Sequence, residues 1–221
     1  DFGTYSFYYS HQITSGEGGM VVCNNKKDYE ILLALRSHGW SRGKNVYAKN
    51  AKKYPNLDPR YIFINSGFNL RPTDIQAAIG RSQFKRLDFF KKTRTMNKNK
   101  IINSLVKDKR WKGQFKFVKY SKRINPSYMV LPILLDIKFL DKKKKFIKLI
   151  EEKGLETRPI ISGSFVNQPS TKLYNLNPGN QKFNGAQKVQ DQGFVIGLST
   201  KKIDKKKIDF VTNVLFLIDS I

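Results

Sequence analysis

The hydrophobic positions at the start of the chain predict two short strands joined by a tight turn. Residues 2–9 have the apolar and aromatic content of a buried strand, and residues 18–22 have that of a second one. The turn SGEGG lies between them, and its glycines adopt positive φ without strain. A lone opening strand would be an unprotected edge, so we expect it to belong to a larger sheet.

The apolar spacing that follows predicts a helix and then a loop. The helix runs from about residue 26 to residue 37, and Gly39 follows it as a stop signal. Its predicted buried side chains are Tyr29, Leu32 and Leu33. Residues 40–60 are polar and contain two prolines, which predicts a long loop, and residues 61–64 are expected to form a brief strand.

A second helix is predicted to begin near Pro72 or Thr73 and to continue past Met96. Proline in the first turn and a threonine available as a cap both favour this start. The apolar side of this helix consists of Ile75, Ala78, Ile79, Leu87 and Phe90. We expect the helix to link two domains, which divide the chain into residues 1–106 and residues 107–221.

The pattern beyond residue 107 is that of a compact α/β unit. Strands are predicted at 115–120, 127–136 and 155–161, and a helix is predicted at 140–153. A last helix has one apolar face, formed by Ile208, Val211, Leu215 and Ile218.

The net charge of +25 brings nucleic acid into consideration, because clustered lysines bind phosphates. The lysines, however, are spread along nearly the whole chain. The densest runs, at 141–154 and 199–211, alternate with apolar residues at helical spacing, which is typical of the solvated face of an amphipathic helix. The sequence contains neither zinc-finger spacing nor an RNA-binding sheet signature, so we expect no nucleic-acid partner.

The single cysteine, Cys23, excludes an intramolecular disulfide and cannot by itself hold a structural zinc or an iron–sulfur cluster. We therefore expect no metal site. No window reaches the roughly 18 consecutive apolar residues of a membrane span, and the first residues lack the pattern of a signal peptide. These features lead us to expect a cytoplasmic protein without a membrane partner.

Three segments together resemble the DegT/DnrJ/EryC1/StrS family of sugar aminotransferases and dehydratases. They are TYSFYYSHQITSGEGGMVV at 4–22, LRSHGWSR at 35–42 and SGFNLRPTDIQAAIG at 66–80, and ETRPI at 156–160 and GFVIG at 193–197 extend the likeness. The resemblance implies the fold type I architecture of pyridoxal-phosphate enzymes. Residues 1–106 would be the end of the large cofactor-binding domain with the linking helix, and residues 107–221 the small α/β domain.

The resemblance also implies that the chain is the carboxy-terminal half of a longer protein. The acidic residue that pairs with the pyridine nitrogen of the cofactor, and the residue that stacks on its ring, would then lie in the other half.

The family pattern places a serine five residues before the lysine that binds the cofactor covalently. Ser6 matches this serine, which would donate to the cofactor phosphate, but position 11 is histidine. An imidazole cannot form the covalent bond, yet it is a good general base near neutral pH. A histidine at this position is a feature of the family's 3-dehydratases, so the resemblance assigns catalysis to His11. Without the family context, His11 would be interpreted as a structural residue that caps a turn.

By resemblance, the protein uses pyridoxal 5′-phosphate and pyridoxamine 5′-phosphate to remove the C3 hydroxyl of a nucleotide-linked 4-keto-6-deoxy sugar. The sequence is most similar to the cluster-free dehydratases of the family, in which L-glutamate regenerates the aminated cofactor. The iron–sulfur type needs several cysteines beyond LRSHGWSR, and this chain has none after Cys23.

Other residues receive roles from the resemblance. Asn69 would reach across a homodimer interface to the partner's cofactor phosphate, and Arg71 would point at the same active site, where its fork suits a carboxylate or phosphate. Arg158 in ETRPI would contact substrate, with a surface ion pair as the alternative. His38 is interpreted as structural, at a helix end.

Two other functions stay open at this point. One is a nucleotide-sugar aminotransferase of the same family, whose lysine has been lost or relocated. The other is a non-catalytic, basic binding module that retains only the scaffold.

Overall fold

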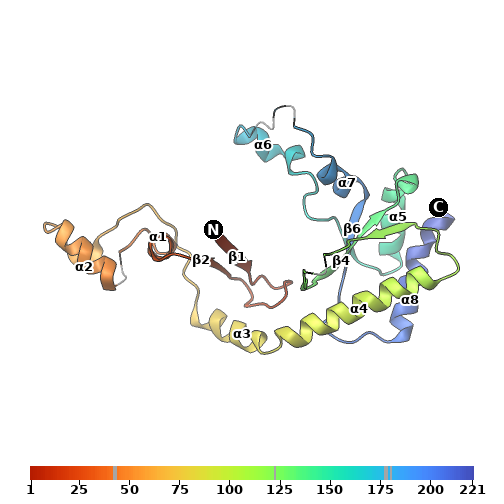
Figure 1. Ribbon diagram of the computed structural model, residues 1–221, viewed down its shortest axis with the longest axis horizontal. Coiled ribbons are helices and arrows are strands. Elements are labelled where there is room, and N and C mark those ends of the chain that lie inside the picture. The colour runs from red at the N-terminus through yellow and green to blue at the C-terminus, as the bar shows by residue number, and fades with distance from the viewer. Residues whose placement is uncertain (42–43, 122, 177–178, 180) are drawn as a thin grey trace. The chain divides into compact units, whose positions relative to one another are not determined.

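The computed structural model describes residues 1–41, 44–121, 123–176, 179 and 181–221. The chain forms two compact units, Asp1–Leu87 and Asp88–Ile221 (Figure 1). Because each unit has its own elements, the two are described separately. The domain boundary expected after residue 106 stays a prediction about the whole protein.

The first unit opens with the predicted hairpin. Strand β1 (Phe2–Ser6) pairs antiparallel with β2 (Gly19–Cys23), in a register that places Phe2 opposite Cys23 and Ser6 opposite Gly19. The sequence predicts a buried strand at residues 2–9, and this is wrong within the first unit. Side chains on both faces of the two-stranded sheet are open to solvent. Phe2 is 58% exposed and Tyr5 54% exposed.

Helix α1 (Lys26–Arg36) follows where the sequence predicts it. Asn25 caps its start by accepting a hydrogen bond from the Asp28 N–H, 2.8 Å away. Ala34 is buried and Leu32 and Leu33 are half-buried. Tyr29 is exposed, which contradicts the prediction that it is buried.

Helix α2 (Lys44–Lys53) lies inside the segment expected to be a loop. The sequence KNVYAKNAKK contains no proline or glycine and several good helix formers, and the two prolines that favoured a loop both follow it. A short 3₁₀ helix, η1 (Pro59–Tyr61), comes next. The brief strand expected at 61–64 is reduced to one isolated bridge between Phe63 and Trp40, whose ring stacks on that of Tyr61.

The single long helix predicted from residue 73 past residue 96 is interrupted. Helix α3 (Asp74–Phe84) begins with a capping box formed by Thr73 and Gln76, and α4 (Leu87–Lys107) starts after a two-residue turn. In this turn the Arg86 N–H donates to the Gln83 carbonyl, a tighter bond than the α-helical one.

The second unit contains a four-stranded antiparallel sheet in the order β3-β4-β6-β5. These strands are β3 (Phe115–Phe117), β4 (Val130–Leu135), β5 (Thr157–Arg158) and β6 (Gly193–Gly197). The predicted strands are therefore confirmed in place but are shorter. Strand β6 is central and nearly all buried, and periodicity alone did not indicate it.

Helices α4, α5 (Lys143–Glu152) and α8 (Lys205–Leu215) share one hydrophobic core with this sheet. The fully buried side chains of this core include Leu105, Phe115, Phe146, Ile150 and Leu215. The remaining elements of the unit are η2 (Ile137–Phe139), η3 (Phe165–Asn167), α6 (Pro169–Leu173), α7 (Asn184–Gln192) and η4 (Phe216–Ser220). In α5 the exposed lysines Lys144, Lys145 and Lys148 lie among the core residues Phe146 and Ile150, whereas the lysines of α8 are confined to its first turn.

Asn97 fixes the segment between β6 and α8 to α4. Its side chain is fully buried, donates to the carbonyls of Ser199 and Lys201, and accepts from the Ile203 N–H. Since these bonds use both donors and the oxygen of the amide, burial of this polar group is compensated.

Candidate active site

Ser6 and His11 both belong to the connection of the β1–β2 hairpin. Ser6 ends β1, and its Oγ accepts a hydrogen bond from the Tyr8 N–H at 3.3 Å. The His11 N–H donates to the Tyr8 carbonyl at 3.0 Å, and the His11 ring packs edge-on against the Tyr8 ring, with 5.7 Å between centroids. The half-buried imidazole is therefore oriented by one turn that also carries the serine hydroxyl.

The base of this connection is closed by backbone hydrogen bonds. The Phe7 N–H donates to the Gly18 carbonyl at 2.8 Å, and the Ser15 N–H donates to the Phe7 carbonyl at 2.9 Å. Helix α3 adds a further bond, from the Gln76 amide to the Glu17 carbonyl at 3.0 Å. The residues that carry His11 are thus held by the start of α3.

Gln76 is a residue that the sequence interpretation missed. Its Oε1 accepts from the Thr73 N–H, so the same side chain completes the capping box and reaches the hairpin. The spacing of a threonine and a glutamine three residues apart was the signal that could have identified it.

A short antiparallel ladder joins the end of α1 to the segment before α3. The Ser41 N–H donates to the Ile62 carbonyl, and the Ile64 N–H donates to the Gly39 carbonyl, both at 2.9 Å. Ser37 then forms a bridge with Asn69.

Further along this ladder, backbone bonds lie on each side of Asn69. The Phe68 N–H donates to the Leu35 carbonyl at 2.7 Å, and the Leu70 N–H donates to the Arg36 carbonyl at 2.9 Å. Together with the Gln76 bond, the ladder connects all three segments on which the family resemblance depends.

The backbone of the ladder fixes Asn69, and Arg71 follows two residues later. Both side chains are exposed, and among the described residues neither has a hydrogen-bond or ion-pair partner. Free amide and guanidinium groups on a backbone held in this way are available to a ligand or to a second chain.

His38 has a left-handed backbone, with φ of 62°, between the last turn of α1 and Gly39. Its N–H donates to the Phe68 carbonyl at 2.7 Å, and its side chain is exposed. The structural role expected for His38 at a helix end is consistent with this backbone bond.

Arg158 lies in the second unit, on β5. Its guanidinium donates to the Glu156 carboxylate at 2.5 Å and to the Thr157 carbonyl at 2.9 Å. The ion pair considered as the alternative for Arg158 is therefore present, and it is largely exposed, so it contributes little to stability.

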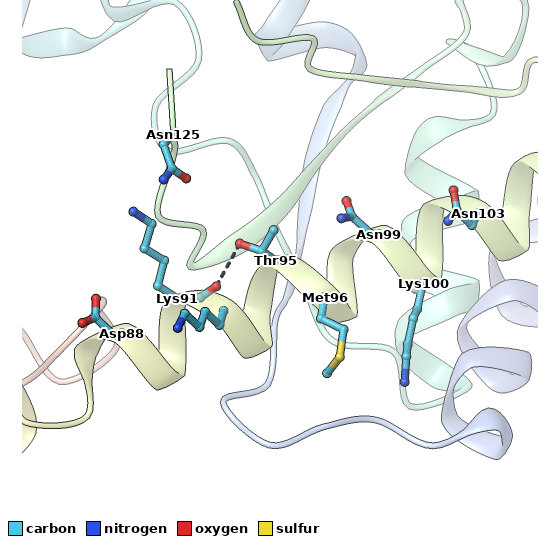
Figure 2. A pocket seen from close by; sticks show the side chains of 9 residues that line it. Asp88, Lys91, Thr95, Met96, Asn99, Lys100, Asn103 and Asn125 are labelled. Atoms are coloured by element: carbon cyan, nitrogen blue, oxygen red, sulfur yellow. Dashed lines mark hydrogen bonds between the residues drawn. The ribbon is translucent and has the colours of Figure 1, made fainter. Parts of the chain in front are cut away.

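A groove of about 680 Å³ runs along α4 in the second unit (Figure 2). Lys91, Thr95 and Asn99 are among its lining residues, and the Lys91 side chain extends toward Asn125. None of the residues predicted to act in catalysis or binding lines this groove.

Across the described residues, histidine, cysteine and acidic side chains nowhere gather in threes around a possible metal position. Within the same residues, no helix is long and apolar enough to cross a membrane.

The chain has a mixed α/β fold that matches the architecture of a family of aminotransferases. The chain belongs to the DegT/DnrJ/EryC1/StrS aminotransferase family, whose model matches residues 1–216. The resemblance and the α/β fold class predicted from the sequence are thereby confirmed.

Two relatives illustrate the relation. GDP-4-keto-6-deoxy-D-mannose 3-dehydratase of Escherichia coli O55:H7 is 27% identical over 205 residues, which are 88% of this chain and 49% of the relative. GDP-perosamine synthase of Escherichia coli O157:H7 is 30% identical over 164 residues, 73% of this chain and 38% of the relative. The chain thus spans about half the length of the curated relatives that it matches.

A solved structure shows the same fold. The E. coli GDP-4-keto-6-deoxy-D-mannose-3-dehydratase with bound hydrated PLP superposes with a TM-score of 0.77 at 24% identity, and the match covers 97% of this chain and 54% of that one.

Proposed function

We propose that the whole protein is a pyridoxal-phosphate-family 3-dehydratase. It removes the C3 hydroxyl of a nucleotide-linked 4-keto-6-deoxyhexose, and L-glutamate regenerates the aminated cofactor. One feature of the sequence carries this proposal: histidine occupies position 11, five residues after Ser6. By resemblance, the family's aminotransferases have their cofactor-binding lysine at this position. The name of the dehydratase relative supports the same reaction and GDP as the nucleotide.

The hairpin offers groups that suit pyridoxamine 5′-phosphate. Ser6 Oγ accepts a hydrogen bond from the Tyr8 N–H, and its own hydrogen can be donated to a phosphate oxygen. The exposed Asn69 amide of the partner subunit of a homodimer would donate to the same phosphate. The bound cofactor supplies the electron sink that allows the C3 hydroxyl to leave.

His11 moves the proton in this proposal. Its imidazole accepts a proton from the C4′ carbon of the cofactor, and the resulting imidazolium donates it to the departing C3 hydroxyl. The edge-on contact with Tyr8 holds the ring, so the transfer does not depend on a freely rotating side chain. His11 cannot bind the cofactor covalently, which favours dehydration over amine transfer.

Arg71 and Arg158 are assigned to anionic groups of the reactants. The guanidinium of Arg71 has no partner among the described residues and suits a carboxylate or a phosphate. Arg158 would exchange its exposed bond with Glu156 for a bond with substrate. Because the chain has no cysteine after Cys23, we expect no iron–sulfur cluster. The apolar pattern of the chain, which contains no membrane span, leads us to expect a cytoplasmic enzyme.

The second candidate is a nucleotide-sugar aminotransferase, which the similarity to GDP-perosamine synthase favours. An aminotransferase of this family binds its cofactor through a lysine amine. Reduction of the full-length protein with borohydride separates the two candidates, because it makes such a bond permanent. A cofactor covalently attached to a lysine would contradict our proposal.

The direct test supplies the full-length protein with pyridoxamine 5′-phosphate, L-glutamate and GDP-4-keto-6-deoxymannose, and follows product mass. We expect a 3-deoxy sugar. The His11→Asn variant should lose this activity by a factor of about 10³ or more while its absorbance shows bound cofactor. Amino-sugar formation would support the second candidate, and unchanged turnover of the variant would remove His11 from the mechanism.

A further inference from the structure

We infer that the close crossing of Gly39 and Gly67 is a positioning device that acts on the active site of the partner subunit. The inference rests on the proposed function, in which Asn69 serves the cofactor bound by the other chain. Gly67, which touches no reactant, determines whether the Asn69 side chain reaches that cofactor. The evidence is the space at the two glycines and the bonds around Asn69.

The backbones of the two glycines approach so closely that neither position has room for a side chain. A Cβ at Gly67 would lie 2.3 Å from the Gly39 nitrogen and 2.7 Å from the Leu35 carbonyl oxygen. A Cβ at Gly39 would lie 1.7 Å from the Asn65 carbonyl oxygen. These neighbours are backbone atoms, which cannot rotate away as a flexible side chain would, so a substitution must displace the chain.

The displacement would reach Asn69 because Phe68, the one residue between Gly67 and Asn69, is held by bonds that a shift of residue 67 must strain or break. Phe68 exchanges hydrogen bonds with Leu35 and His38, at 2.7 Å each, and Leu70 is bonded to Arg36. The Asn69 side chain has no hydrogen-bond or ion-pair partner among the described residues, so its position depends on this backbone. Moving residue 67 away from Gly39 therefore moves the Asn69 amide relative to the last turn of α1.

The His11 turn is held by its own backbone bonds and by the Gln76–Glu17 bond to α3, and none of these bonds belongs to the ladder. Phe7, Ser15 and Gly18 close it through their backbones, and none of these bonds involves residues 62–70. A defect at Gly67 should therefore spare the His11 of its own chain and damage the site to which its Asn69 reaches. In a homodimer that site belongs to the other subunit.

Mixed dimers of two differently tagged full-length chains test this arrangement. A dimer of one His11→Asn chain and one Asn69→Ala chain has one intact site and one doubly damaged site. We expect about half of the wild-type turnover from it, although both homodimers are nearly inactive. Failure to recover activity would overturn the shared site and our inference together, while a 3-deoxy product from the wild type would still support the dehydratase assignment.

The Gly67→Ala chain should behave like the Asn69→Ala chain. Paired with His11→Asn it should recover about half of the turnover, and paired with Asn69→Ala it should recover none. Its homodimer should bind pyridoxamine 5′-phosphate about tenfold more weakly, measured by absorbance titration. If Gly67→Ala fails to rescue His11→Asn, or rescues Asn69→Ala, the inference is wrong while the proposed function stands.

A second variant covers the case in which Gly67→Ala does not fold. Leu70→Pro places no side chain at the glycine crossing, and it removes the N–H that donates to the Arg36 carbonyl beside Asn69. We expect a smaller, severalfold loss of cofactor affinity with the same pairing pattern. Recovered turnover in a dimer with the Asn69→Ala chain, or no recovered turnover in a dimer with the His11→Asn chain, would overturn the inference for this variant too.

Discussion

The Gln76 side chain donates a hydrogen bond to the Glu17 carbonyl, 3.0 Å away, and so ties the start of α3 to the turn that carries His11. The same side chain accepts from the Thr73 N–H in the capping box of the helix. The start of α3 and the turn that carries His11 are therefore stabilised by one amide.

Replacement of Gln76 by leucine removes both bonds. We expect a loss of about 1–2 kcal/mol in the free energy of unfolding, typical of a lost cap and one hydrogen bond. Turnover should fall while cofactor affinity changes less, because the His11 turn becomes less constrained. Urea unfolding and steady-state kinetics measure the two effects, and Gln83→Leu, on the same helix but away from the cap, is the matched control.

In the second unit, replacing Asn97 should destabilise the fold more than replacing the exposed Asn99 of the same helix. In Asn97→Leu the carbonyls of Ser199 and Lys201 lose the amide that donates to them, and the Ile203 N–H loses its acceptor. We expect a destabilisation of about 3 kcal/mol or more, measured by urea unfolding. Asn99→Leu, at an exposed position two residues along the same helix, should change stability by less than about 0.5 kcal/mol. Equal effects of the two substitutions would contradict this account.

Arg71→Lys tests the guanidinium of the proposed site. Lysine keeps the charge but loses the planar pair of donors, so we expect the KM for glutamate or for the nucleotide sugar to rise about tenfold with little change in kcat. Which KM rises identifies the group that Arg71 binds. Arg81→Lys, at an exposed position on α3, should leave both values unchanged. An unaltered KM for both reactants would remove Arg71 from the site.

Acid stability of the second unit should depend on Asp108. The side-chain hydrogen bond from Arg110 lowers the pKa of Asp108 from 3.8 to about 2. Because the folded pKa is the lower one, the carboxylate stabilises the fold above pH 3.8, and this contribution disappears as the pH falls toward about 2. The Tm difference between the wild type and Asp108→Asn should therefore be largest near neutral pH and vanish near pH 2. A difference that persists at pH 2 would point to another cause.

The sequence predicted the elements whose signals are local. The hairpin with Ser6 and His11 follows from two apolar and aromatic segments around a glycine turn, and the start of α3 follows from its cap. The apolar face of α8 is likewise visible in the spacing of Val211 and Leu215. Each of these features is determined by residues that are close to one another in the sequence.

The features that the sequence did not predict depend on distant residues. The ladder that brings Ser37 beside Asn69 joins backbone atoms, and no side-chain periodicity records such a pairing. The exposure of Phe2 depends on which layers cover a strand rather than on the strand's own composition. Two other differences have a local cause. The apolar stripe continues across the turn at residues 85–86 and so predicts one unbroken helix, and the two prolines that follow α2 predict a loop over the whole segment.

The chain contains two tryptophans, and each unit holds one of them. Trp40 stacks on Tyr61 and Phe63 beside the ladder, and Trp111 stacks on Phe117 at the edge of the other unit's core. Intrinsic tryptophan fluorescence therefore reports on each of the two units through one tryptophan. With Trp111 changed to phenylalanine, the tryptophan emission of this chain follows the ladder around Trp40, and with Trp40 changed it follows the second unit, so unfolding of either unit is visible without an attached dye.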